Sequence, residues 1–303
     1  MPTFALALVV VAALAHAAWN VLAKTASGGA TFVWLFSASA AVIWLPAAVV
    51  AEVVAPGSLG LEAVAFMAGS GALHALYFVL LQRGYRDGDL SLVYPLARGT
   101  GPLLSTAAAL VVFSERPSAL ALAGGATIVG AVLSLAGAGR ASGAVPGDAG
   151  DAGNAGDARD ARHRRRAVGF ALLTGVAIAS YTLWDKQAVG PLGLSPIVYY
   201  WGANVAETTF LTAFVAHRRL EIRRTWRACR RQALGVALLS PLAYILVLFA
   251  LAHAPVSYVA PARELSILLG AVAGITVLEE GHRRRRVLAA AAIFVGIVGL
   301  AVG

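Results

Sequence analysis

Arginine occurs twice within stretches of the chain that are otherwise almost free of charge. Arg98 lies in the segment YPLARGTGP, residues 94–102, and Arg263 follows Pro261 in the second half of the chain. The guanidinium group is a planar fork that can hold a carboxylate or a phosphate through two parallel hydrogen bonds. We therefore expect Arg98 and Arg263 to clamp an anionic group, one from each half of the chain.

The composition indicates that these stretches cross a membrane. Hydrophobic residues make up 59% of the chain, charged residues only 13%, and the mean hydropathy is +0.77, whereas soluble domains contain about 25% charged residues. Apolar runs long enough to cross a hydrocarbon core of about 30 Å recur, and their unalternating pattern favours helices over barrel strands. The predicted spans are residues 4–23, 31–54, 61–82, 90–113, 118–138, 167–186, 196–216, 232–253, 256–278 and 287–302. We predict an all-α integral membrane protein with ten transmembrane helices, located in the cell membrane.

The chain divides into two similar halves around a polar segment. Residues 139–166 are rich in Gly, Ala and Asp and end in a basic run, so we expect a flexible linker between residues 1–138 and 167–303. HAAWNVLAK in the first span aligns with IASYTLWDK in the sixth, and LVYPLARGTGPLL in the fourth aligns with SYVAPARELSILL in the ninth. Because each half has five spans, the two copies enter the membrane from opposite sides. This predicts two inverted five-helix repeats.

Basic residues are concentrated in the loops that follow odd-numbered spans. These loops include the runs 164–166 and 283–286, whereas the other side holds only Arg116 and Lys186. Cytoplasmic loops carry the excess of positive charge, so we expect the odd-numbered loops and the linker in the cytoplasm and both termini outside. The net charge of +9 then reflects topology and contact with anionic lipid, and no nucleic-acid partner is expected.

Several motifs together resemble the EamA-type branch of the drug/metabolite transporter superfamily. They are HAAWNVLAK, SLVYPLARGTGPLL, the SERP that follows it, YTLWDK and VAPARELSILLGAVAG. The resemblance covers nearly the whole chain and implies ten helices, a central substrate cavity between the halves, and alternating access, often for export of metabolites. The long linker departs from the family's usual pattern. So does the second loop, AEVVAPGSLGLEA, which lacks the basic residues many relatives carry and argues against the family's commonly assumed cytoplasmic termini.

Arg98 lies about 12 Å into its predicted span at about 1.5 Å per residue, close to the middle of the bilayer. An arginine at this depth is costly in lipid, so it should face a cavity or a partner. Pro95, Pro102 and Pro261 each remove a helical hydrogen bond near one of the two arginines. We expect these prolines to break the helices at a site in the middle of the membrane.

Three carboxylates are candidate counter-ions or proton carriers: Glu207, Asp185 and Glu264. Glu207 lies within the seventh span, with Tyr200 and Asn204 at helical spacing on the same face. A buried glutamate can bind and release a proton during transport. The alternative is a structural role, in which one of these carboxylates neutralises an arginine and holds the helices together.

Polar side chains also follow helical spacing on the first and sixth spans. His16, Trp19 and Asn20 form a stripe on the first, and Tyr181 and Asp185 form a related stripe on the sixth. Such a stripe must line a cavity or bond across helices, and packing of the aromatic residues remains an alternative to substrate contact. The predicted substrate-binding residues are Arg98, Arg263, Trp19, Asn20, Tyr94, Tyr181, Tyr200 and Asn204.

Other features favour structural roles. His74 lacks metal-ligand spacing to other candidate ligands and is expected to be a structural histidine, and Glu115 is expected to cap a helix or pair with a loop. Gly270 and Gly274 form a GxxxG pair, typical of close helix packing within or between protomers, so a homodimer stays open. The chain has no nucleotide-binding or catalytic motif, so no cofactor, metal or enzymatic activity is expected.

The sequence therefore favours a secondary transporter, in the family's usual sense an exporter, for a small polar metabolite that is anionic or zwitterionic. A proton, another ion or the substrate gradient would drive it. Two alternatives stay open. A protein that handles a lipid carrier or flips a phosphate head group would use the same arginines, and a lateral opening would favour it. A non-transporting sensor or scaffold is less favoured, because no soluble signalling domain is recognisable.

Overall fold

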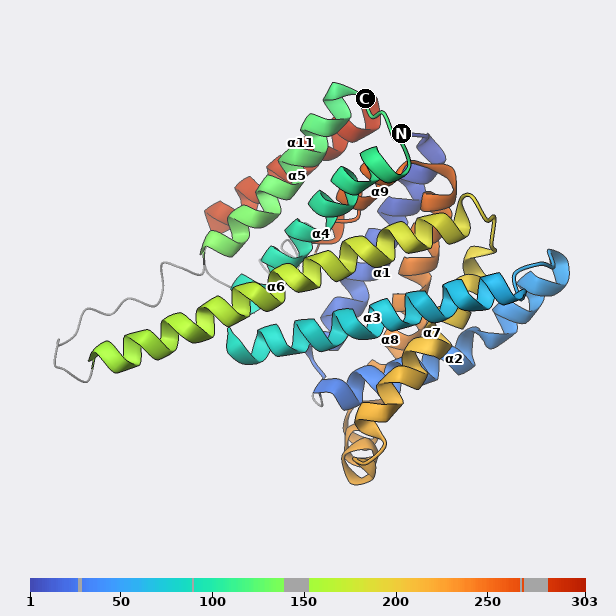
Figure 1. Cartoon of the computed structure of the whole chain (residues 1–303), viewed down its shortest axis with the longest axis horizontal. Coiled ribbons are helices and arrows are strands. Elements are labelled where there is room, and N and C mark those ends of the chain that lie inside the picture. Colours follow the sequence, from blue (N-terminus) through green and yellow to red (C-terminus); the bar gives the residue numbers. More distant parts are fainter. Residues whose placement is uncertain (27–28, 89, 139–152, 268, 270–282) are drawn as a thin grey trace.

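The computed structural model describes residues 1–303 except 27–28, 89, 139–152, 268 and 270–282. The described part is a bundle of helices without a strand (Figure 1). The helices are α1 (Thr3–Lys24), α2 (Gly29–Val54), α3 (Leu61–Asp87), α4 (Leu90–Val112), α5 (Ala119–Ala138), α6 (Gly153–Val189), α7 (Pro196–Val215), α8 (Arg219–His253), α9 (Val256–Ala262) and α11 (Arg283–Val302). Apolar runs fold this way because a helix satisfies its backbone N–H and C=O groups within the segment. The predicted all-α membrane fold is confirmed.

Five of the described helices are long and apolar enough to cross a membrane. They are α1, α2, α3, α8 and the part of α6 from Arg162 to Val189. Shorter apolar helices cover Ala119–Ser134 in α5 and Ala291–Val302 in α11. Large apolar side chains stay exposed on the outside of the bundle, for example Val53, which is 76% exposed. Such a surface is suited to lipid contact.

The packing of the helices shows that the two halves are equivalent. In the two halves, α1 corresponds to α6, α2 to α7 and α3 to α8. α1 packs against α8, and the corresponding helices α6 and α3 also pack against each other. The pairs α2 with α8 and α7 with α3 correspond in the same way. Three further contacts join equivalent helices directly: α2 with α7, α4 with α9, and α5 with α11. This pattern is what a pseudo-two-fold axis requires, so the predicted inverted repeats are confirmed.

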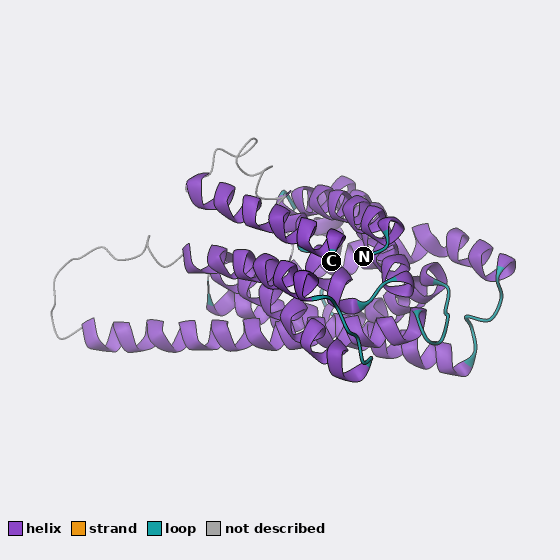
Figure 2. Cartoon of the chain, turned by 90° about the horizontal axis from the view of Figure 1, so that it is seen from above, coloured by secondary structure: helices purple, strands orange, loops and turns teal. Residues whose placement is uncertain are grey.

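The even-numbered connections and both termini lie at one end of the bundle. After α4, the carboxylate of Glu115 accepts hydrogen bonds from the backbone N–H groups of Val256 and Ser257, at 2.7 and 2.9 Å, where α9 begins. Glu115 thus has the expected capping role. The amino group of Met1 donates to the carbonyl oxygen of Leu300 at 3.4 Å, so the two termini are adjacent (Figures 1 and 2).

The starts of α2 and α8, and the end of α3 with the start of the apolar part of α6, lie at the opposite end. The hydroxyl of Thr31 at the start of α2 donates to a carboxylate oxygen of Glu221 at the start of α8, at 2.7 Å. His163 at the start of the apolar part of α6 lies 3.7 Å from Asp87 at the end of α3. The basic segments therefore gather at one end of the bundle, away from both termini.

The structure differs from the predicted boundaries at two basic segments. α6 begins at Gly153, so residues 153–166 are helical where a flexible linker was predicted, and residues 139–152 lie outside the described residues. Ala and Arg have high helix propensity, and a helix already formed in the membrane span extends at little cost. α8 begins at Arg219, but its backbone leaves helical geometry at Cys229, with φ −126° and ψ 19°. This kink separates a basic segment from the membrane span.

α5 and α11 approach each other through glycines. A Cβ atom on Gly124 would lie 2.5 Å from the carbonyl oxygen of Gly296, and a Cβ atom on Gly296 would lie 2.6 Å from the carbonyl oxygen of Gly124. Backbones packed this closely are typical of small residues at membrane helix interfaces. The predicted GxxxG pair at Gly270 and Gly274 lies outside the described residues.

Gly124→Ala should lower the free energy of unfolding by about 1–3 kcal/mol, because the added methyl group forces α5 and α11 apart. Gly130→Ala is the matched control in the same helix, since no atom lies within 4 Å of its Cβ position. Thermal unfolding in detergent compares the two variants. The close packing is contradicted if both variants unfold at the same temperature.

Candidate functional site

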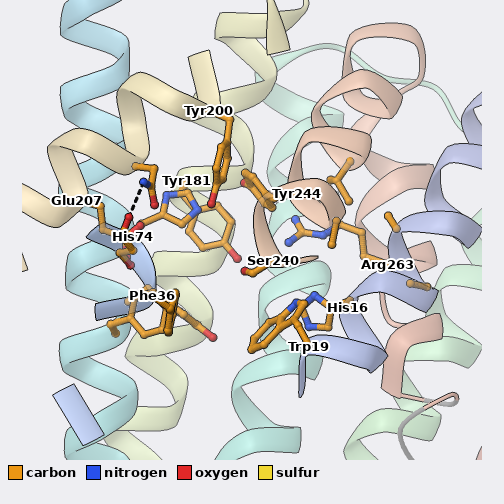
Figure 3. A pocket seen from close by; sticks show the side chains of 18 of the residues that line it. His16, Trp19, Phe36, His74, Tyr181, Tyr200, Glu207, Ser240, Tyr244 and Arg263 are labelled. Atoms are coloured by element: carbon orange, nitrogen blue, oxygen red, sulfur yellow. Dashed lines mark hydrogen bonds between the residues drawn. The ribbon is translucent and has the colours of Figure 1, made fainter. Parts of the chain in front are cut away.

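A cavity of about 120 Å³ lies between the two halves of the protein (Figure 3). Side chains from α1 to α4 line one part of it, and side chains from α6, α7, α8 and the segment after α9 line the rest. The polar and aromatic lining includes His16, Trp19, Phe36, His74, Tyr77, Arg98, Tyr181, Tyr200, Asn204, Glu207, Ser240, Tyr244 and Arg263. At about 30 Å³ per water molecule, the cavity has room for only a few waters.

Arg98 forms an ion pair that crosses from one half to the other. Its Nε atom on α4 lies 3.2 Å from Oε2 of Glu264, just after α9, and the two side chains are only 7% and 3% exposed. The charges are in contact, although the alignment falls short of a hydrogen bond. Of the predicted partners, Glu264 is therefore the one that neutralises Arg98.

Arg263 has a different environment from Arg98. Its guanidinium carbon lies 5.2 Å from the centre of the Tyr244 ring, a cation–π contact. The described part of the chain holds no carboxylate within ion-pair distance of Arg263. This guanidinium lines the cavity, and the carboxylate of the adjacent Glu264 acts on it at longer range, because that carboxylate is in contact with Arg98.

Asp185 holds Tyr244 in place from behind the cavity wall. One carboxylate oxygen accepts a hydrogen bond from Tyr199 at 2.7 Å, and the other accepts one from Tyr244 at 2.6 Å. Asp185 is fully buried and does not line the cavity. Its position supports a structural role, because it fixes the ring on which Arg263 rests.

Glu207 lines the cavity without a cationic partner. The residue is 8% exposed, and its Oε1 atom is buried and has no hydrogen-bond partner among the described residues. The neighbouring Asn204 donates instead to the backbone carbonyl of Ser37 on α2, at 3.0 Å. Figure 3 shows Glu207 and Arg263 on opposite sides of the cavity. An acidic and a basic side chain thus face the same space from its two sides.

Aromatic rings cover much of the wall between these two charges. Tyr181 stacks on His74 with ring centres 4.1 Å apart, and Tyr244 meets His74 edge to face at 5.3 Å. His16 and Trp19 meet edge to face at 4.8 Å. Such rings offer apolar faces to a substrate and are also attractive to cationic groups.

Most of the predicted substrate-binding residues reach the cavity. They are Arg98, Arg263, Trp19, Tyr181, Tyr200 and Asn204. Asn20 and Tyr94 do not line it, and the amide of Asn20 donates to the carbonyl oxygen of His16 on its own helix at 2.8 Å. The indole Nε1 of Trp19 is buried without a partner in the described structure, so a hydrogen-bond donor remains free at the wall.

Some lining residues on α3 and α8 were not among the predicted site residues. His74 was expected to be structural, yet it lines the cavity beside Tyr77. Ser240 and Tyr244 lie one helical turn apart on α8 and face the same space. The spacing of these polar and aromatic residues within apolar helices was the available signal, since such side chains must turn inward in a membrane protein.

The predicted helix breaks differ between the two halves. α4 runs uninterrupted through Pro95 and Pro102, so the predicted break is wrong there. Neighbouring helices can support a membrane helix across the hydrogen bonds that proline removes. α9 does end at Ala262, directly after Pro261, and the chain continues with a tighter turn in which Glu264 N–H donates to the Pro261 carbonyl at 3.0 Å.

Comparison with known protein families gives a match for the second half of the chain. The profile of the EamA-like transporter family matches residues 165–302, the second half of the chain. This half of the chain therefore belongs to the EamA-like transporter family. The predicted resemblance is confirmed there, and the apolar helices make the protein a multi-pass membrane protein.

Solved structures support the fold of the whole chain. One, titled only "Crystal structure of protein", is similar over 100% of this chain and 98% of its own, with a TM-score of 0.72 and 13% identity. At this identity the likeness concerns the fold alone. The search of curated proteins gave no match.

The Arg98–Glu264 ion pair should be strongly coupled in stability. Glu264→Gln leaves Arg98 buried without its counter-ion, which should lower the free energy of unfolding by about 3–5 kcal/mol. Arg98→Met should have a similar effect, because it leaves the carboxylate of Glu264 buried without its counter-ion. The double variant should lose less stability than the sum of the two single changes. Unfolding in detergent measures all four proteins, and additive losses would show that the pair does not interact.

Proposed function

We propose that this EamA-type protein is a secondary transporter of a small polar metabolite that carries an acidic group. The observation behind the proposal is Arg263, which lines the cavity over the ring of Tyr244 and has no acidic partner in the described part of the chain. A guanidinium held in this way can donate two parallel hydrogen bonds to a carboxylate or a phosphate. Arg98 is less suited to this role, because Glu264 already neutralises it.

The opposite side of the cavity supports a zwitterionic substrate. Glu207 presents an unpartnered carboxyl oxygen there, and aromatic rings such as Tyr181 and Tyr200 lie between it and Arg263 (Figure 3). A substrate with an acidic end on Arg263 and a cationic end toward Glu207 would satisfy both groups. When the site is empty, a proton on Glu207 removes the cost of a buried, unpaired charge, so the same residue is suited to proton coupling.

The size and the position of the cavity support alternating access as the mechanism. Pockets that hold metabolites typically measure about 300–1,000 Å³, so the cavity of about 120 Å³ corresponds to a closed conformation. Its lining is divided between two inverted repeats, and rocking of one repeat against the other would open it toward one end at a time. The central position between the repeats favours a transporter over a protein that handles lipid carriers.

Charge at the two ends of the bundle supports an orientation. Arginines gather at the end that carries the odd-numbered connections, including Arg83 and Arg86 on α3 and the run 164–166 on α6. We therefore propose that this end faces the cytoplasm and that both termini face outside. Export is the direction common in the resembled family and is retained as part of the proposal.

Anionic or zwitterionic metabolites should stabilise the purified protein against thermal unfolding. A ligand at 100 times its Kd adds about 2.7 kcal/mol. Arg263→Lys keeps the charge but loses the planar fork, so the stabilisation should disappear. Arg223→Lys is the matched control on an exposed arginine of α8. Stabilisation by neutral or cationic compounds alone, unchanged in Arg263→Lys, would contradict an anion site.

Transport and its coupling to protons can be measured with the purified protein reconstituted in lipid vesicles. Uptake of the stabilising ligand should respond to an imposed proton gradient. Glu207→Gln should lose the response to the gradient, because the amide cannot carry the proton. A zwitterionic ligand should also bind this variant more weakly, because the amide forms no ion pair with its cationic end. Transport by the unaltered protein that ignores the gradient would remove proton coupling from the proposal.

We expect a fluorescent reporter that folds only in the cytoplasm to stay dark in cells when it is fused after Gly303, because the C-terminus is expected outside. The same reporter inserted in the linker 139–152 is the matched control and should fluoresce. A bright C-terminal fusion with a dark linker fusion would reverse the proposed orientation.

A further inference from the structure

We propose that the protein binds the phosphate group of an anionic phospholipid in a second cleft, between α3 and α6. This cleft has a volume of about 570 Å³ and is lined by Arg83, Arg86, Asp87, Arg166 and Phe170. It lies where α3 ends and where the apolar part of α6 begins, at the basic end of the bundle. None of its residues takes part in the central cavity.

The arginines converge because the two helices are tightly packed below them. Arg83 and Arg86 lie one helical turn apart on α3, and Arg166 lies on α6. A Cβ atom on Gly88 would lie only 2.5 Å from the Cβ atom of Ala167. Ala167 itself is fully buried, in a cluster with residues of α3 and α4. The helix ends are therefore held close, and guanidinium groups from both helices reach the same cleft.

The charge of the cleft is positive and incompletely balanced. Its carboxylate, Asp87, lies 3.7 Å from His163. None of the three arginines forms an ion pair with a carboxylate whose side chain the structure describes. Three exposed arginines thus line the cleft with one carboxylate. An anionic oxygen cluster such as a phosphate would accept several of their N–H groups at once.

The position of the cleft favours a lipid head group over a soluble compound as the source of the phosphate. The membrane-spanning segments end at Asp87 on α3 and begin at Arg162 on α6, so the arginines lie at the level expected for lipid head groups. Phe170 adds an apolar surface on the side toward the membrane interior. Basic pockets between transmembrane helices bind anionic head groups in this way. Because α3 and α6 belong to different repeats, the bound lipid would contact both halves.

Thermal unfolding of the full chain in neutral detergent tests the site with phosphatidylglycerol as the probe. The unfolding temperature should rise with phosphatidylglycerol and should not rise with phosphatidylcholine. The triple variant Arg83→Gln/Arg86→Gln/Arg166→Gln should lose this rise and bind phosphatidylglycerol at least ten-fold more weakly. The control triple Arg223→Gln/Arg224→Gln/Arg227→Gln removes equal charge from exposed positions of α8 and should keep the rise.

Each other outcome overturns the proposal. Equal losses in the two triple variants would show that only overall charge attracts the lipid. A rise with inorganic phosphate and none with phosphatidylglycerol would assign the cleft to a soluble phosphate compound. If the triple variant does not fold, Arg166→Lys gives the test. This variant keeps the charge but loses the guanidinium group, so it should bind phosphatidylglycerol several-fold more weakly. Unchanged binding would contradict a guanidinium site.

Discussion

Charges that lie between membrane-spanning helices have no bulk water to solvate them, so each needs a partner inside the protein. The structure meets this constraint with three arrangements. Glu264 neutralises Arg98, two tyrosine hydroxyls satisfy Asp185, and the ring of Tyr244 supports Arg263. The partners within each arrangement lie on different segments of the bundle, so the same contacts also hold the bundle together. Among the described residues, Arg263 has no carboxylate within ion-pair distance and one oxygen of Glu207 has no hydrogen-bond partner, and both side chains line the central cavity.

The inverted repeats make this distribution of charge possible. Equivalent helices α4 and α9 pack against each other, which brings the two similar arginine motifs together at the centre of the protein. The copies have nevertheless diverged. α4 continues through its prolines with Arg98 paired, whereas α9 ends beside Arg263 and leaves that arginine to the cavity. A symmetric framework thus carries an asymmetric site, in which one arginine stabilises the contact between the halves and the other is available to a substrate.

The sequence was sufficient to predict the helical class, the repeats and the positions of most spans, because lipid leaves the backbone few alternatives. It also placed Arg98, Arg263 and Glu207 in the interior, since charge is rare there. It could not decide which carboxylate pairs with which arginine, because that depends on the register between helices far apart in sequence. His74 and Tyr244 were missed for a related reason: their roles come from stacking on Tyr181 and from bonding to Asp185, contacts that no local spacing encodes. Residues 153–166 form a helix because their Ala and Arg residues have high helix propensity. The Gly and Asp residues of the same segment led to the prediction of a flexible linker.

The central claim is that Arg263 and Glu207 face a cavity that opens to water at one end of the bundle at a time. Labelling by a charged, membrane-impermeant thiol reagent tests it most directly, with a cysteine placed at Ser240 in a Cys229→Ser background. Ser240 lines the cavity, whereas Ala250, the matched control on the same helix, is fully buried away from it. The account predicts that Ser240→Cys is labelled from either side of oriented vesicles and that Ala250→Cys is not. Protection of Ser240→Cys from both sides would contradict it.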